Sequence, residues 1–310
     1  MIFLYVALCL AVLLLSCSYA LFRIAVARGW ERPWEDPASL ERYIGPEHVA
    51  LVRKGLAWLE EQKPQDHFLQ SFDGLRLRGR WLPAPSALGT IILFHGWRSS
   101  VVGDFSPVLP FYQKLGFNLL LVDQRSHGKS QGKYITFGVR ESRDAADWVS
   151  LHNREFGTCP VYLGGISMGA TTVLLASGAG LPNNVAGVIA DCGFSSPWEI
   201  MKSVTKERLH LPAFPLLYLV DFWCRVAARF DPKAASAVLA QKNNFLPTLF
   251  LHGEADRFVP CQMSRDAYAA CAGKKQLLLV PNAGHGRSYL TDQPRCQSVL
   301  ENFLIEHLPK

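Results

Sequence analysis

The sequence lacks any paired or clustered cysteines of the kind that bind metals, although it contains 8 cysteines in 310 residues. None of them forms a C-x-x-C pair, and no spacing of cysteine and histidine resembles a zinc site. Scattered cysteines in a chain of this length are typical of small, buried, reduced thiols, and they favour a reducing compartment. The cysteine pattern therefore gives no indication of a metal site.

Charge is also sparse. Asp, Glu, Lys and Arg make up 19% of the residues, and the net charge is +6. The basic residues do not gather into a cluster with interleaved aromatics, which argues against nucleic-acid binding. No repeat period or low-complexity tract is visible. With 49% hydrophobic residues, the chain can bury one large core, with or without an inserted segment.

The first 22 residues, MIFLYVALCLAVLLLSCSYALF, carry no charge. As a helix they would extend about 33 Å, enough to cross a hydrocarbon core of about 30 Å. A basic start typical of a signal peptide is absent, and Arg23, Arg28 and Arg32 follow the stretch. This favours an uncleaved anchor with a cytoplasmic body. Two alternatives stay open: an exported protein cleaved at the small-x-small site 18–20, and a poor lipoprotein-type match at Cys17.

The interval 23–66 is expected to be a juxtamembrane helical segment. Pro46 stands at a helix-entry position, apolar residues then recur on one helical face, and Pro64 ends the helix. The folded core is expected to begin well after residue 29. A chain without residues 1–29 is therefore expected to be soluble and active.

Residues 67–310 have the pattern of an α/β domain. Alternating apolar and polar residues about Asp73-Gly74 predict a β-hairpin. Six short apolar runs follow, mostly separated by helix-length segments: 90–96, 117–123, 160–167, 185–191, 247–253 and 275–280. Such strands predict a mostly parallel sheet that is flanked by helices and buried on both faces. Ligands bind to sheets of this kind at the carboxyl ends of the strands.

One interval, about 194–246, breaks this rhythm. It is helical in character and rich in aromatics, with prolines as breaks, which predicts a helical cap inserted over the sheet. Four of its aromatic residues either line an acyl pocket or pack the cap onto the sheet: Trp198, Phe214, Tyr218 and Trp223. The sequence leaves both interpretations open.

Three residues of catalytic types each follow a predicted strand. Ser167 lies in a G-x-S-x-G motif, Asp256 in HGEADRFVP and His285 in PNAGHG. A serine hydroxyl needs a neutral imidazole to take its proton, and a carboxylate must orient that imidazole and stabilise its charged form. Gly165 and Gly169 let the backbones of strand and helix approach where the serine is strained. The order Ser, Asp, His is that of α/β-hydrolases.

From about residue 67 to its C-terminus the chain resembles the α/β-hydrolase superfamily. It is most similar to the bacterial branch of membrane-anchored esterases, lysophospholipases and serine-aminopeptidase-like enzymes. The motifs are LFHGW, DQRSHGKS, GISMG, HGEADRFVP and NAGHG. The resemblance implies an oxyanion hole formed by the backbone N–H groups of Trp97 and Met168, in a loop shaped by His95 and Gly96. Ser126 departs from the related pattern, which usually has glycine there.

Other polar residues near these motifs have structural interpretations. His252 and His127 are expected to hold a strand end and a loop, and Asp123 and Arg125 to form an internal polar network. Asp191, at the end of its strand, is an alternative catalytic acid, but Asp256 has the better motif.

The expected function is hydrolysis of a carboxylic ester through an acyl-enzyme, with no metal or organic cofactor. An apolar acyl group is favoured, so the substrate is a small-molecule or lipid-like ester and the partner is the membrane rather than nucleic acid. A peptidase or thioesterase uses the same machinery and stays an alternative. A hypothesis from another class is a membrane-tethered binding protein without turnover, although such proteins normally lose a triad residue.

Overall fold

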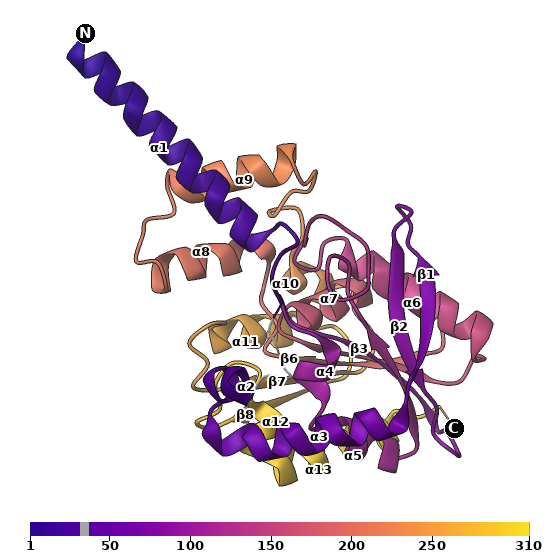
Figure 1. The fold of residues 1–310 in the computed structure, drawn as a ribbon. Helices are drawn as coiled ribbons and strands as arrows, with labels where there is room; N and C mark the ends of the chain where they lie inside the picture. Colours follow the sequence, from indigo (N-terminus) through magenta and orange to yellow (C-terminus); the bar gives the residue numbers. More distant parts are fainter. Residues whose placement is uncertain (32–36, 310) are drawn as a thin grey trace.

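The computed structural model describes residues 1–31 and 37–309, which form one eight-stranded sheet with helices around it (Figure 1). The strands are β1 (Gln65–Gln70), β2 (Arg76–Leu82), β3 (Gly89–Phe94), β4 (Phe117–Val122), β5 (Val161–Ile166), β6 (Val185–Asp191), β7 (Thr248–Gly253) and β8 (Lys275–Val280). Their spatial order is β1-β2-β4-β3-β5-β6-β7-β8. In this described sheet β2 pairs antiparallel with β1 and with β4, and the other five pairs are parallel.

The strands are those that the apolar runs predict. Every residue of β3, β4 and β7 is buried, as expected for strands covered on both faces. The hairpin about Asp73-Gly74 is β1 and β2. The predicted fold class, a mostly parallel sheet flanked by helices, is therefore confirmed. Parallel pairing places the segments that follow β3, β5, β7 and β8 at one edge of the sheet.

Helices cover both faces of the sheet. One face packs against α6 (Glu141–Glu155), α7 (Met168–Ser177), α10 (Ala237–Gln241) and α11 (Cys261–Ala270), around Trp148 and Phe250. The other packs against α3 (Val49–Gln62), α4 (Val101–Phe105), α5 (Leu109–Lys114) and α13 (Gln293–Glu306), around Phe117 and Tyr162. The described chain also contains three short elements: α2 (Pro37–Ile44), the 3-10 turn η1 (Pro46–His48) and α12 (Ser288–Thr291).

The interval 194–246 contains helices and, among its described residues, no strand. Its first helices, α8 (Pro197–Glu207) and α9 (Leu216–Val226), lie beyond the strand ends (Figure 1). Ser196 caps α8 by accepting a hydrogen bond from the Glu199 amide at 3.0 Å. The last helix, α10, packs against α7 and α11 in the sheet core instead. The cap proper therefore consists of α8 and α9.

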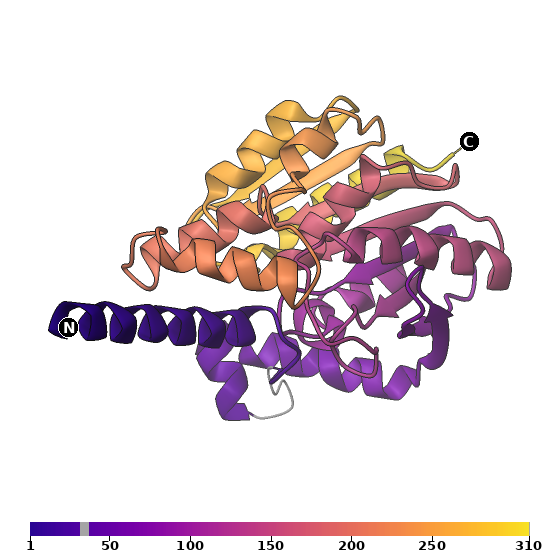
Figure 2. The same cartoon turned by 90° about the horizontal axis from the view of Figure 1, so that it is seen from above.

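Helix α1 (Ile2–Ala25) projects from the rest of the molecule (Figures 1 and 2). It is long and apolar enough to cross a membrane, and residues 2–17 are exposed. Its last turns are different. Phe22 is 1% exposed and Val26, just past the helix, is 0% exposed, because both pack into an apolar cluster with α8 and α9. The folded core thus includes the end of α1.

One buried arginine binds the end of α1. The Arg98 guanidinium donates hydrogen bonds to the carbonyl oxygens of Ile24 (2.7 and 3.2 Å), Ala27 (2.7 Å) and Trp30 (3.0 Å). Carbonyls at a helix C-terminus lack partners within the helix and carry partial negative charge, which a guanidinium satisfies. The expectation that the folded core begins well after residue 29 is therefore wrong, because Phe22 and Val26 belong to the core and Arg98 binds the end of α1. That a chain without residues 1–29 is soluble and active stays a prediction.

Candidate active site

Ser167 lies on the tight turn that joins β5 to α7. Its φ of 56° and ψ of −114° belong to a region that residues other than glycine rarely adopt. Two glycines make this turn possible. A Cβ on Gly165 would overlap the backbone of Gly169, and a Cβ on Gly169 would overlap the carbonyl oxygen of Phe94 in β3. The G-x-S-x-G spacing is thus a steric requirement of three closely packed backbones.

The structure brings the three residues predicted from the sequence into one hydrogen-bonded chain. The Ser167 hydroxyl donates to Nε2 of His285 at 2.9 Å, and Nδ1 of His285 donates to Oδ2 of Asp256 at 2.7 Å. A carboxylate only accepts, so Nδ1 carries the proton and Nε2 is the acceptor. This arrangement can take the proton from Ser167 as its oxygen attacks an electrophile.

The carboxylate of Asp256 is fixed from several sides. Its Oδ1 accepts hydrogen bonds from the amides of Phe258 (2.8 Å) and Val259 (2.9 Å). Burial alone would raise the pKa of Asp256, but hydrogen bonds from His252 and His285, together with the Val259 amide, outweigh burial and hold that pKa well below its usual value. Asp256 is therefore ionised at neutral pH and can stabilise an imidazolium on His285.

His252 contacts the triad at Asp256. Its Nε2 donates to the Val259 carbonyl oxygen at 3.0 Å and lies 3.3 Å from Oδ2 of Asp256, while Nδ1 is 2.7 Å from the Ser264 hydroxyl oxygen. His252 has the structural role that the sequence predicts. The sequence analysis did not predict that His252 supports the carboxylate of Asp256. The sequence signal for this contact is the four-residue spacing between His252 and Asp256 in HGEAD.

The amides of Trp97 and Met168 are the oxyanion-hole donors implied by the family resemblance. Trp97 follows β3, and Met168 begins α7, where a helix N-terminus favours negative charge. Neither amide donates a hydrogen bond to any residue that the structure describes. Trp97, Ser167 and His285 line a common cavity of about 60 Å³. The assignment of these two amides stays a prediction.

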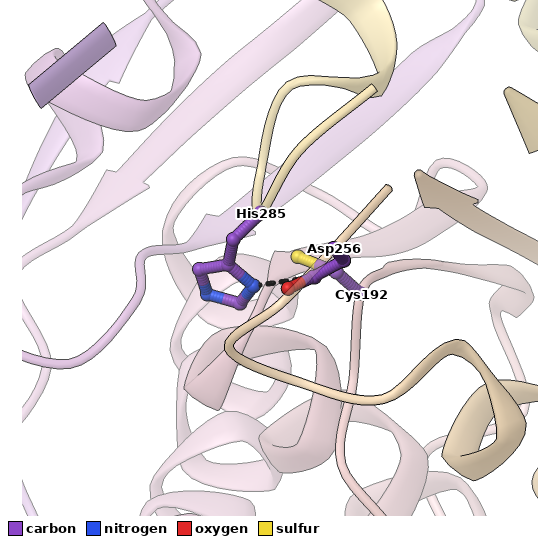
Figure 3. A group of neighbouring side chains, drawn as sticks. All are labelled: Cys192, Asp256 and His285. Carbon is purple, nitrogen blue, oxygen red and sulfur yellow. Dashed lines mark hydrogen bonds and ion pairs between the residues drawn. The ribbon is translucent and has the colours of Figure 1, made fainter. Parts of the chain in front are cut away.

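A sulfur atom lies beside the triad, as Figure 3 shows. One ligand atom each of Cys192, Asp256 and His285 lie within 4.8 Å of one another. However, Oδ2 of Asp256 and Nδ1 of His285 are 2.7 Å apart, whereas two nitrogen or oxygen ligands of a tetrahedral zinc ion lie about 3.3 Å apart. Burial also raises the pKa of the Cys192 thiol well above its usual value, so the thiol is neutral. We assign this cluster to the hydrogen-bonded pair rather than to a metal site.

The alternative acid, Asp191, does not bond to His285 in the described structure. Its carboxylate accepts a hydrogen bond from the Ser288 hydroxyl at 2.9 Å, and its backbone carbonyl accepts the Ser167 amide at 2.8 Å. Burial raises the pKa of Asp191. Asp191 thus supports the turn that holds Ser167.

Buried histidines hold the loops behind the site. Nε2 of His95 accepts from the Gln124 amide, and Nε2 of His127 accepts from the Arg98 amide, each at 3.1 Å. Ser126, where related chains usually have glycine, has a φ of 66°. The loop therefore keeps a left-handed conformation despite the side chain, and its hydroxyl donates to a nearby carbonyl.

The charged residues of the same loop form the internal network that the sequence predicts. Asp123 pairs with Arg78 at 3.1 Å, and Arg125 pairs with Asp144 at 2.6 Å. All four side chains are largely buried. Because these charges are satisfied by one another, they have a structural role beneath the site.

An apolar cavity of about 210 Å³ opens beside Ser167. None of the four cap aromatics singled out in the sequence lines it. Tyr218 contacts both Trp198 and Phe214, and the Trp223 indole donates to the Ser18 hydroxyl at 3.0 Å. They pack within the cap and against α1. The cavity walls are mostly aliphatic residues of α1, α8 and α9, with three phenylalanines: Leu21, Ile24, Ile200, Met201, Val204, Leu217, Val220, Phe137, Phe194 and Phe258.

Comparisons with known proteins agree with this fold. A model of the alpha/beta hydrolase family matches residues 91–296. The chain is similar to the uncharacterized protein YqkD of Bacillus subtilis, with 28% identity over 246 residues, 79% of this chain and 80% of the relative. In structure it is similar to the esterase Pf2001 of Pyrococcus furiosus, with a TM-score of 0.66, 22% identity and coverage of 83% of this chain and 93% of that chain. It is also similar to Est1E of Butyrivibrio proteoclasticus, solved with ferulic acid bound, with a TM-score of 0.62, 19% identity and coverage of 79% and 100%.

Proposed function

This chain belongs to the alpha/beta hydrolase family and is a hydrolase, and we propose that it cleaves carboxylic esters that have an apolar acyl group, with Ser167 as nucleophile. The observation that carries this proposal is the hydrogen-bonded chain from Ser167 through His285 to Asp256, at the base of an apolar cavity. A nucleophile with its base and an acyl-binding space are the parts that acyl transfer requires.

In the first half-reaction, Oγ of Ser167 attacks the ester carbonyl carbon while its proton passes to Nε2 of His285. The carbonyl oxygen becomes an oxyanion, which the Trp97 and Met168 amides stabilise. His285 then gives its proton to the departing alcohol oxygen as the carbon–oxygen bond breaks. The product is an acyl group esterified to Ser167.

In the second half-reaction, water takes the place of the alcohol. His285 accepts a proton from the water as the water oxygen attacks the acyl carbon. It then returns a proton to Oγ of Ser167 as the acid leaves. Asp256 stays ionised throughout, in keeping with its lowered pKa. No metal or organic cofactor takes part in these steps.

The acyl preference is inferred from the cavity lining, which holds no charged side chain among its described residues. An apolar chain gains about 0.8 kcal/mol for each methylene buried, whereas a charged group would lose its hydration there without a partner. With a methylene taken as about the size of a water molecule, roughly 30 Å³, the cavity holds about seven.

Graded esters test the proposal. On p-nitrophenyl esters of increasing chain length, kcat/KM should rise about fourfold for each methylene until the cavity is full at about seven, as the burial energy requires. The matched p-nitroanilides should be cleaved far more slowly. Amide cleavage at comparable rates would favour the peptidase alternative, and rates independent of chain length would contradict the acyl-binding role of the cavity.

We further propose that α1 is an uncleaved membrane anchor with the body on the cytoplasmic side. Ser18 is fully buried and bound by Trp223, so a chain cut before Leu21 would lose this contact. Arg23 and Arg28 follow the apolar stretch, as the positive-inside rule requires. The third arginine of the sequence argument, Arg32, lies outside the described residues.

The orientation is tested with protease on intact spheroplasts of a bacterial host. The body should stay undigested until the membrane is permeabilised, and the purified chain should still begin at its native N-terminus. A body digested from outside, or a chain that begins near Leu21, would overturn the anchor and favour an exported enzyme.

A further inference from the structure

The end of α1 forms one wall of the apolar cavity beside Ser167. Leu21, Ile24 and Ala25 face the cavity opposite the cap helices. This wall is fixed to the catalytic loop, because the Trp97 indole donates to the Ala25 carbonyl oxygen at 2.8 Å and Arg98 donates to the carbonyl oxygens of Ile24 and Ala27. The cavity is therefore complete only with α1 in place.

The exposed part of α1 is too short to cross a bilayer by itself. The exposure of α1 is uninterrupted over residues 2–17 and first broken by the buried Ser18. At 1.5 Å per residue this run extends about 24 Å, less than the roughly 30 Å of a hydrocarbon core. A complete crossing needs the helix as far as about Leu21. Leu21 lines the cavity, so the hydrocarbon of the bilayer ends where the cavity begins.

Helix α9 of the cap carries an apolar stripe. Tyr218, Phe222 and Val226 are spaced by four residues along α9 and are each about half exposed, at 50%, 48% and 57%. Helix α9 lies beside the inner half of α1 (Figures 1 and 2). An apolar stripe next to a membrane-spanning helix is continuous with the lipid that surrounds that helix.

We propose that α1 and the stripe of α9 together seat the enzyme in the bilayer surface, and that its substrate is an acyl ester resident in that bilayer. The acyl chain enters the cavity between α1 and the cap, passing from lipid to an apolar protein surface without crossing water. This inference rests on the proposed ester hydrolysis, and it adds the source of the substrate and the route by which the chain enters.

The test compares two substrates with the full-length chain in phosphatidylcholine vesicles. One is 4-methylumbelliferyl oleate dissolved in the bilayer, and the other is water-soluble p-nitrophenyl acetate. Rates are expressed per site labelled by a fluorophosphonate probe, so that misfolded protein does not count. Leu21→Trp, which fills the entry, should lower the oleate-to-acetate ratio at least about tenfold. Leu8→Trp, on an exposed turn of the same helix, should leave the ratio within about twofold of the unmodified chain.

The stripe is tested in the same way. Phe222→Glu places a charge where lipid is expected and should lower the ratio about fivefold or more. The matched control is Phe245→Glu, because Phe245 is 78% exposed and precedes β7 at the opposite end of the sheet. This control should leave the ratio unchanged.

The outcomes separate the two proposals. A ratio that Leu21→Trp does not change overturns the entry route, while acetate hydrolysis still supports the esterase. An unchanged ratio for Phe222→Glu overturns the seating in the bilayer, since the stripe then does not contact lipid. If the unmodified chain hydrolyses neither ester, the proposed function itself fails.

Discussion

Replacement of Ser167 by alanine is expected to lower kcat for ester hydrolysis on the order of 10⁴–10⁶-fold. The substitution removes the oxygen that forms the acyl-enzyme and leaves His285 without the proton that it would take. The fold should survive, because the backbone amide of Ser167 still donates to the Asp191 carbonyl and the neighbouring glycines are unchanged. Hydrolysis of p-nitrophenyl butyrate and the thermal unfolding midpoint measure the two effects separately.

Ser86→Ala is the matched control, since Ser86 is exposed in the turn before β3, whereas the proposed site residues follow the strands at the opposite end of the sheet. It should keep full activity and full labelling by a fluorophosphonate probe, whereas Ser167→Ala should not be labelled. Activity of Ser167→Ala within about tenfold of the unmodified enzyme would place the nucleophile elsewhere.

Replacement of Asp256 by asparagine is expected to lower kcat about 10³–10⁴-fold, with a much smaller change in KM. Asparagine has nearly the same shape, but it removes the negative charge that stabilises the imidazolium of His285. It also removes the acceptor-only partner that keeps the proton on Nδ1. Because Asp256 acts through His285 rather than on the substrate, binding is affected less than the chemical step.

Asp191→Asn provides the comparison, because Asp191 is an equally buried carboxylate at the same edge of the sheet. Its carboxylate bonds to Ser288, and its link to Ser167 is through the backbone, which the substitution keeps. A loss below about tenfold is expected. Equal losses for the two variants, or a larger loss for Asp191→Asn, would contradict the assignment of Asp256.

The sheet and the grouping of the triad could be predicted from the sequence because both follow local rules. Strands buried on both faces are continuous apolar runs, and residues just after parallel strands meet at one edge. Ser167, Asp256 and His285 obey both rules. Even the strained turn is visible in the sequence, since only glycine fits at Gly165 and Gly169.

The cavity walls could not be predicted, because they depend on contacts between distant parts of the chain. Leu21 belongs to α1 and Leu217 to α9, and nothing in either local pattern indicates that they face one cavity. The role of Arg98 is hidden for the same reason, as its acceptors lie about 70 residues earlier. The aromatic content of the cap made Trp223 a candidate for lining the cavity, yet aliphatic residues line most of it.

The hydrogen bonds from Arg98 to the end of α1 also limit the positions that the catalytic body can take relative to this helix. A body on a flexible linker of 20 residues would sweep a radius of about 25 Å. Here the catalytic loop is bonded to the last turn of the helix, so with α1 in the bilayer, as proposed, Ser167 would keep one height and one tilt relative to the lipid. Catalysis is then a two-dimensional search. The rate of encounter follows lateral diffusion and the surface density of esters in the leaflet, rather than their concentration in the surrounding water.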